Sequence, residues 1–115
     1  MEDCIFCQII GKKIPAKEVY RDSRVVAFYD ISPKAPVHIL VVPVEHFSSL
    51  IDSKDIHQSL LGELMLRLKK IAEKLNLHKK GYKVVINNGE ASGQLVFHLH
   101  LHLLGGWQEK SHWQV

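Results

Sequence analysis

Three histidines alternate with leucines near the carboxyl end of the chain, at His98, His100 and His102. Side chains on an extended strand alternate between two faces, so this spacing places three imidazoles on one face and leucines on the other. On a helix the same positions would fan out over about 200° and converge on nothing. Adjacent imidazolium ions repel, so at least one ring should stay neutral and nucleophilic. The pattern predicts a strand whose face does acid-base, nucleophilic or metal chemistry.

Two cysteines, Cys4 and Cys7, lie near the amino end of the chain. Their spacing is that of half a zinc site, which needs two further nitrogen or sulfur ligands. Redox thiols and buried, unliganded cysteines are the alternatives. The bulky Ile5 and Phe6 between the cysteines, and the absence of an expected strand before Cys4, disfavour a thioredoxin-like redox motif.

A glycine and an amide side chain, Gly93 and Gln94, come shortly before the histidines. Glycine lets the backbone approach a phosphate closely, where amide donors can bind its oxygens, and glutamine can donate to the phosphate or to the bridging atom. A plain turn is the alternative reading of such a segment.

The remaining sequence predicts the elements that position these residues. Residues 5–10 are expected to form a short helix ended by Gly11, and residues 19–20 and 25–29 a hairpin. Residues 37–42, apolar on both faces and followed by Pro43, should form a central strand. A long amphipathic helix should start near residue 54, with Asp52 or Ser53 as its cap. Strands are then expected over residues 82–87 and 97–104.

These elements favour an α+β fold with an antiparallel sheet, because the long helix is inserted once among hairpin-like strands. A chain of 115 residues is expected to form one domain, residues 1–115. Within it, residues 1–12 form a helical segment with the cysteines and residues 107–115 form a tail. A small sheet with one helix leaves apolar surface, which favours a homodimer.

The composition is that of an ordinary soluble protein, with 46% hydrophobic and 23% charged residues. The net charge of +3 comes from dispersed lysines, so no nucleic-acid groove is indicated, although a phosphorylated ligand would be attracted. No apolar run approaches the ~18 residues that span a membrane, and the acidic amino terminus is unlike a secretory signal. We expect a cytoplasmic protein without membrane contact. His57, His78 and His112 belong to no motif and are expected on the surface.

The run from His98 to Leu104 resembles the signature of the histidine triad (HIT) family. Segments 28–33, 35–38, 87–89 and 93–94 are similar to nucleotide-contacting segments of its Hint-like branch, the histidine triad nucleotide-binding proteins. The resemblance extends from residue 5 to about residue 106. It implies a HIT-like fold, with a five-stranded antiparallel sheet, one long and one short helix, and a sheet continued across a homodimer.

The resemblance also implies an activity. It is a purine nucleotide-binding hydrolase that cleaves nucleoside 5′-phosphoramidates or related AMP conjugates at the α-phosphate and requires no cofactor for catalysis. His100 would form a nucleotidyl-histidine while a backbone carbonyl fixes its tautomer, and His102 and His38 would orient the phosphate and transfer protons, with His98 completing the catalytic set. A dinucleoside polyphosphate hydrolase of the Fhit type and a nucleotide-binding scaffold with little catalysis are the alternatives.

Further site residues follow from the resemblance. Asp30 would accept hydrogen bonds from the ribose, and the base and phosphate would contact a larger set: Ile5, Phe6, Ile9, Ile14, Phe28, Ile31, Asn87, Gly93, Gln94, Leu95, His100 and His102. Leu95 stands where Hint-like members commonly have a small hydroxyl residue, so one phosphate or leaving-group contact should be missing. His46 and His98 would complete a structural zinc site with the cysteines. Trp113 is the tail residue that would reach a neighbouring active site in a dimer.

Overall fold

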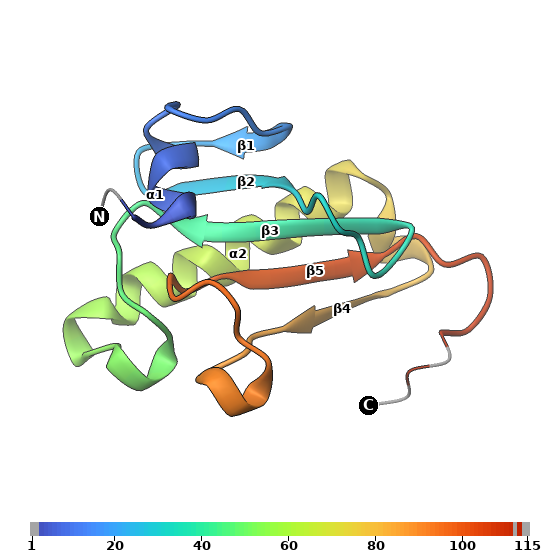
Figure 1. Cartoon of the computed structure of the whole chain (residues 1–115). Coiled ribbons are helices and arrows are strands. Elements are labelled where there is room, and N and C mark those ends of the chain that lie inside the picture. The colour runs from blue at the N-terminus through green and yellow to red at the C-terminus, as the bar shows by residue number, and fades with distance from the viewer. Residues whose placement is uncertain (1–2, 112, 114–115) are drawn as a thin grey trace.

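A five-stranded antiparallel sheet forms the centre of the computed structural model, which describes residues 3–111 and 113 (Figure 1). The strand order is β1-β2-β3-β5-β4, so strands distant in sequence lie side by side. The strands are β1 (Glu18–Arg21), β2 (Val25–Tyr29), β3 (Val37–Pro43), β4 (Tyr82–Val85) and β5 (Leu101–Gly105). The predicted α+β class and the antiparallel sheet are confirmed.

The central strand β3 is buried on both faces because its side chains alternate between two hydrophobic cores. Ile39 and Val41 belong to the core on one side of the sheet, and Leu40 and Val42 belong to the core on the other. β3 pairs with β2 along one edge and with β5 along the other. The expectation of a central strand that ends at Pro43 is confirmed.

Two α-helices cover the two faces of the sheet (Figure 1). The long helix α2 (Gln58–Lys74) buries a stripe of apolar residues that includes Leu64 and Leu68. The short helix α1 (Ile5–Ile10) packs Phe6 and Ile9 against the other face and ends at Gly11, as predicted.

The start of the long helix differs from the prediction. α2 begins at Gln58, with His57 as its N-cap residue, so the expectation that Asp52 or Ser53 caps it is wrong. Two 3-10 turns, Leu50–Asp52 and Asp55–His57, precede it. The Lys54 backbone N–H donates to Nδ1 of His57 at 2.9 Å. The His57 side chain thus satisfies a backbone N–H that lies before the helix, and it stabilises a separate turn there.

His57 is buried, which corrects the expectation of a surface residue. The residue is 7% exposed, and its ring stacks on the Phe47 ring at 4.3 Å and lies 2.6 Å from a carboxylate oxygen of Glu45. The partners are ten or more residues away in the chain, so no local pattern shows them. His78 is exposed, as expected, and His112 lies outside the described residues.

Two strand boundaries differ from the prediction. β4 ends at Val85, and β5 begins only at Leu101. Residues 98–100 lie outside the ladder, where the Leu99 backbone N–H donates to the Phe47 carbonyl at 2.8 Å. The predicted alternation of faces persists, because Leu99 and Leu101 lie in the core beneath α2 while His100 and His102 line a cavity on the opposite face.

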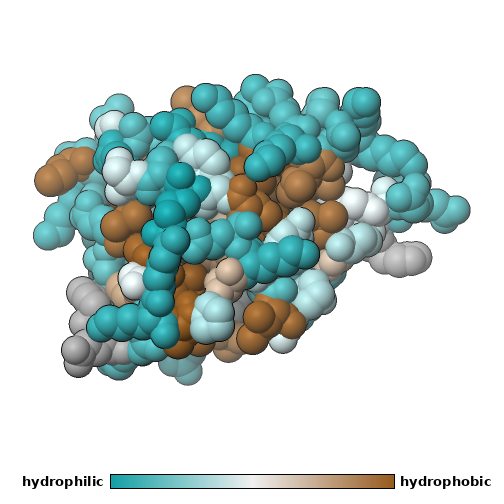
Figure 2. Space-filling view, turned by 90° about the horizontal axis from the view of Figure 1, so that it is seen from above, coloured by the Kyte–Doolittle hydropathy of each residue, from teal (hydrophilic) through white to brown (hydrophobic). Residues whose placement is uncertain are grey.

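The outer surface combines charged side chains with apolar patches. Seen from above, apolar groups gather near the centre of the face and polar groups surround them (Figure 2). Ile31 and Leu95 are 95% and 89% exposed, respectively. Within residues 3–111 and 113, none of the helices has the length and apolar character needed to cross a membrane.

Candidate functional site

A cavity of about 720 Å³ lies between α1, the central strands and the loop before β5. Its volume is in the range of small-molecule sites. His100 and His102 reach it from the segment that leads into β5, and His38 reaches it from β3. Asp30 lies beside them, directly after β2.

Most of the predicted nucleotide-site residues meet at this cavity. Those that line it are Ile5, Phe6, Ile9, Ile14, Phe28, Asp30, Ile31, His38, Asn87, Gly93, Leu95, His100 and His102. Gln94 and His98 do not line it.

Gln94 is directed into the protein. Its side chain is 3% exposed; Oε1 accepts from the Gly89 backbone N–H, and Nε2 donates to the carbonyls of Ser48 and Val96. Both ends of the amide are therefore used to hold the loop together. The neighbouring Gly93 has φ +97°, a left-handed conformation that favours glycine, and it stays at the cavity.

His100 has a defined tautomer. Its Nδ1–H donates to the backbone carbonyl of His98 at 2.7 Å. A neutral imidazole carries one N–H, so Nε2 holds a free lone pair. Burial lowers the pKa of His100 below its usual value, against the opposing effect of the His98 carbonyl. The ring at the cavity wall is therefore neutral near pH 7 and can act as a nucleophile.

His38 and His102 form a second set of defined tautomers. The Lys34 backbone N–H donates to Nδ1 of His38 at 3.0 Å, so the proton of the His38 ring is on Nε2. This Nε2–H donates to Nδ1 of His102 at 2.9 Å, which leaves the His102 proton on its own Nε2. Burial, with the neighbouring His100 and His38, lowers the pKa of His102 to about 4. His102 thus presents an N–H donor beside His100. The centres of the two rings are 4.9 Å apart.

Lys34 was not among the residues predicted from the sequence. It lines the cavity, and its backbone N–H starts the hydrogen-bond series through His38 to His102. A backbone donor has no residue-type signature. The available signal was its place in a proline-bounded loop four residues before His38.

Asp30 has one oxygen in use and one near the histidines. Oδ1 accepts the Ser32 backbone N–H at 2.7 Å, and Oδ2 lies 3.5 Å from Nε2 of His38. Asp30, His38 and His102 lie close enough together to hold a metal ion. The tautomers oppose this, because the His38 nitrogen carries a proton and the His102 nitrogen accepts it.

Four other side chains form a second cluster beside α1: Cys4, Cys7, His46 and His98, whose ligand atoms all lie within 4.8 Å of one another. The Nδ1 atoms of His46 and His98 are 3.0 Å apart, and each faces a cysteine sulfur at 3.4 to 3.5 Å. Tetrahedral zinc with ordinary bond lengths would separate such ligand atoms by about 3.3 to 3.8 Å. The two sulfur–nitrogen distances lie in this range and the two nitrogens are slightly closer than it, so the donor set fits a zinc ion after a small outward movement of the rings.

The tautomer of His98 also suits a metal ligand. Its Nε2–H donates to the Pro43 carbonyl at 2.8 Å, so the lone pair on Nδ1 faces the cysteines. Such a second hydrogen bond is usual for metal-bound histidine. Burial lowers the pKa of His98 to about 4. Burial and the neighbouring Cys4 raise the pKa of Cys7 to about 11, so a bound cation would have to displace the thiol proton.

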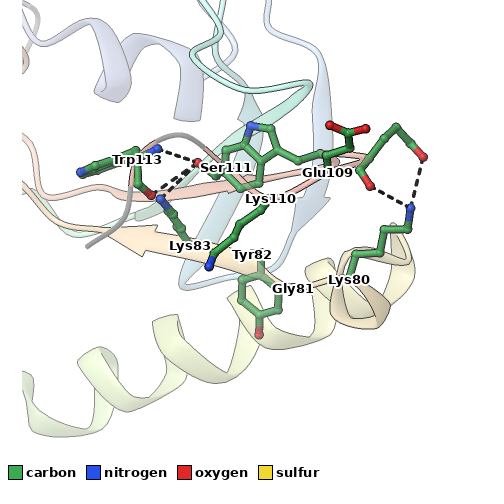
Figure 3. A pocket seen from close by; sticks show the side chains of 10 residues that line it. Lys80, Gly81, Tyr82, Lys83, Glu109, Lys110, Ser111 and Trp113 are labelled. Atoms are coloured by element: carbon green, nitrogen blue, oxygen red, sulfur yellow. Dashed lines mark hydrogen bonds between the residues drawn. The ribbon is translucent and has the colours of Figure 1, made fainter.

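The tail lies beside residues 80–83, at the start of β4, where it forms a second cavity of about 580 Å³ (Figure 3). Nζ of Lys83 lies over the Trp113 ring at 4.7 Å and donates to Oγ of Ser111 at 3.2 Å. Trp113 lines both this cavity and the histidine cavity. Its predicted contact with the active site of a second subunit stays a prediction.

Comparison with known proteins agrees with these features. The HIT domain family matches residues 11–109, and the chain belongs to this family. Protein HitA of Neisseria gonorrhoeae is 49% identical over 105 residues, covering 91% of this chain and 97% of HitA.

Two solved structures are also similar. A HIT family hydrolase from Legionella pneumophila superposes with a TM-score of 0.90 at 42% identity, covering 92% of this chain and 95% of its own. A histidine triad nucleotide-binding protein from Candida albicans superposes with a TM-score of 0.80 at 32% identity, covering 95% of this chain and 85% of its own.

Proposed function

We propose that the protein hydrolyses nucleoside 5′-phosphoramidates or related AMP conjugates at the α-phosphate, through a nucleotidyl group on His100. The observation that carries the proposal is the tautomer of His100, whose Nδ1–H is held by the His98 carbonyl at 2.7 Å. This leaves the Nε2 lone pair on a ring that lines the cavity. The similar HIT family hydrolase and the similar histidine triad nucleotide-binding protein support the broader reading of a hydrolase that binds a nucleotide.

The reaction would proceed in two displacements. In the first, the Nε2 lone pair of His100 attacks phosphorus and the bond from phosphorus to the leaving nitrogen breaks. With the anionic substrate bound, the hydrogen-bonded His38–His102 pair would carry one extra proton, and the departing nitrogen takes a proton from Nε2–H of His102, which leaves the pair neutral. In the second, water attacks phosphorus, the bond to His100 breaks, and the water restores the proton of His102. One water is consumed, giving a free amine and a nucleoside monophosphate.

Substrate binding would use the remaining wall of the cavity. Asp30 would accept hydrogen bonds from the ribose hydroxyls, while Phe6, Ile9 and Phe28 would enclose the base. The left-handed backbone at Gly93 would bring amide donors close to the phosphate. The leaving group would extend over Leu95, whose side chain is 89% exposed and offers no hydrogen bond.

A zinc ion held by Cys4, Cys7, His46 and His98 would have a structural role. Four protein ligands fill a tetrahedral shell and leave no position for water or substrate. The ion would tie α1 to the end of β3 and to the segment before β5, and no step of the hydrolysis passes through it.

The protein would act as a homodimer whose sheet continues through the β4 edges of two subunits. In the described part of the chain, β4 pairs with β5 alone, so its other edge is open. Met65 and Leu66 of α2 are 47% and 57% exposed, which leaves apolar surface for a partner. Sedimentation equilibrium would show the mass of two chains, and a monomer at micromolar concentration would contradict this.

A substrate panel tests the proposed activity. Steady-state kcat/KM would be measured with an adenosine 5′-phosphoramidate, an adenylate conjugate and a dinucleoside polyphosphate. The proposal expects the phosphoramidate or the adenylate conjugate to be preferred by at least about tenfold. A preference for the dinucleotide would indicate the Fhit type of activity. Tight AMP binding with negligible turnover of every substrate would indicate a binding protein.

A further inference from the structure

Helix α1 contributes to both sites. Cys4 is its N-cap residue, and its Sγ accepts the Cys7 backbone N–H at 3.4 Å. Both cysteines belong to the Cys4/Cys7/His46/His98 cluster. Phe6 and Ile9 of the same six-residue helix line the histidine cavity. The helix has no basic or acidic residue at its ends. These two sets of contacts hold the helix together with the core beneath it and a hydrogen bond from Arg21 to the Ile10 carbonyl.

His98 is the second connection. Its side chain is 0% exposed and lies in the cluster, while its backbone carbonyl accepts the Nδ1–H of His100. The Phe6 ring contacts both histidines, with centres 6.0 Å from His98 and 5.0 Å from His100. The group that holds His100 in its nucleophilic tautomer is therefore part of a candidate metal ligand.

We propose that a metal ion at Cys4, Cys7, His46 and His98 positions His100 and the Phe6 wall, so that metal and nucleotide bind with positive coupling. The inference rests on the proposed function, because it needs a nucleotide in the histidine cavity. It assigns His98 as a positioning residue that acts through its carbonyl. Coupling between sites is reciprocal, so a nucleotide must also tighten metal binding by the same factor.

The coupling must pass through the protein. None of the four cluster residues is among those that line the cavity, and a metal with four protein ligands has no position for a phosphate oxygen. The contacts that can carry the coupling are the His98 carbonyl, which accepts the Nδ1–H of His100 at 2.7 Å, and the Phe6 ring, whose centre lies 6.0 Å from that of His98 and 5.0 Å from that of His100.

The direct test compares AMP binding by zinc-loaded and chelator-treated protein, using isothermal titration calorimetry. We expect the dissociation constant for AMP to rise by about 5- to 100-fold on zinc removal. The reciprocal experiment measures zinc affinity by chelator competition with and without saturating AMP, and we expect the same factor. An AMP affinity that is unchanged by zinc in folded protein would overturn the coupling.

Three variants separate positioning from general loss of stability. Cys7→Ser should lower AMP affinity as zinc removal does. His46→Cys should retain AMP affinity, because a Cys3His set still binds zinc. The ligand atom of His46 is Nδ1, the ring nitrogen nearer the backbone, so the shorter cysteine side chain can take its place. Leu68→Ala removes a buried side chain from the core under α2, on the other side of the sheet, and should leave AMP affinity unchanged. Equal weakening in Leu68→Ala and Cys7→Ser would contradict a positioning role.

A spectroscopic readout follows the tautomer itself. Nitrogen chemical shifts of His100 should show protonated Nδ1 and free Nε2 in the zinc-loaded protein, and a mixture of tautomers after zinc removal. Where the metal-free protein is unfolded, the reciprocal zinc measurement on the folded, loaded protein decides the question, and zinc affinity independent of AMP overturns the inference. Absence of AMP binding in both forms would instead refute the proposed function.

Discussion

The histidine cavity and the Cys4/Cys7/His46/His98 cluster draw on one alternating run, yet they suit different chemistry. The pKa values of His98 and His102 are both lowered to about 4, chiefly by burial. The two rings differ in the backbone group that determines their tautomer. At His98, the Pro43 carbonyl accepts a hydrogen bond from Nε2–H, so the lone pair on Nδ1 faces the two thiols. At His102, the Lys34 backbone N–H donates to Nδ1 of His38, and the Nε2–H of His38 donates to Nδ1 of His102. The proton of His102 is therefore on Nε2. Backbone partners thus determine whether a buried histidine is a ligand or a proton donor.

The largest effect is expected from removing the nucleophile in the cavity. His100→Ala should lower kcat by more than about 10⁴-fold, because the nucleophile acts as a unit with its partners. AMP binding should remain within a few-fold, since Asp30 and the apolar wall are intact. Steady-state kinetics and calorimetry measure both quantities. Substantial turnover in this variant would show that another group attacks phosphorus.

The matching change in the Cys4/Cys7/His46/His98 cluster should lower zinc binding and should not directly alter the residues that react with the substrate. Cys4→Ser should lower zinc affinity by at least about 100-fold, because loss of a first ligand exceeds the effect of losing its outer partners. Metal analysis of purified protein should give about one zinc per chain in the parent and much less in the variant. Equal zinc content in the two proteins would mean that the cluster is not the metal site.

A smaller effect is expected at the edge of the cavity. Asp30→Ala should weaken AMP binding by about 1 to 3 kcal/mol, the range for hydrogen bonds to a charged group. Deoxy-AMP is the matched control ligand, and its affinity should fall less than that of AMP. If both ligands weaken equally, Asp30 does not recognise the ribose and acts through His38, which lies 3.5 Å from its Oδ2.

The smallest effect concerns acid stability. The pKa of His102 is near 4 when folded and near 6.5 when unfolded, so the unfolded chain binds more protons between these values and stability falls as pH falls. Protonation of this ring in the unfolded chain should lower the free energy of unfolding by about 1 kcal/mol at pH 5.5. Denaturant unfolding of the parent and of His102→Gln measures the difference. A parent that is no more acid-sensitive than the variant would contradict a neutral, buried His102.

Local periodicity accounts for what could be predicted from the residues alone. The alternation of His98, His100 and His102 with leucines determines which side chains face the core, and the apolar run of residues 37–42 identifies the central strand. Both depend on short-range geometry that is visible in sequence. The family signature then indicated how His98 and the cysteines meet, which spacing alone does not show.

Contacts that local periodicity does not specify account for what could not be predicted. The burial of Gln94 depends on the carbonyls of Ser48 and Val96, and that of His57 depends on the Glu45 carboxylate and the Phe47 ring. The start of β5 at Leu101 reflects a bond from Leu99 to the Phe47 carbonyl. Carbonyls and amides occur at every position, so residue type carries no sign of which ones meet.

A nucleotidyl group on His100 can be trapped and detected during the first turnover. Protein mixed with an excess of an adenosine 5′-phosphoramidate and quenched within the first turnover would be digested and analysed by mass spectrometry. We predict an acid-labile nucleotidyl group on the peptide that contains His100, and its absence in His100→Ala. A nucleotidyl group on another residue, or turnover with no covalent species under single-turnover conditions, would contradict it.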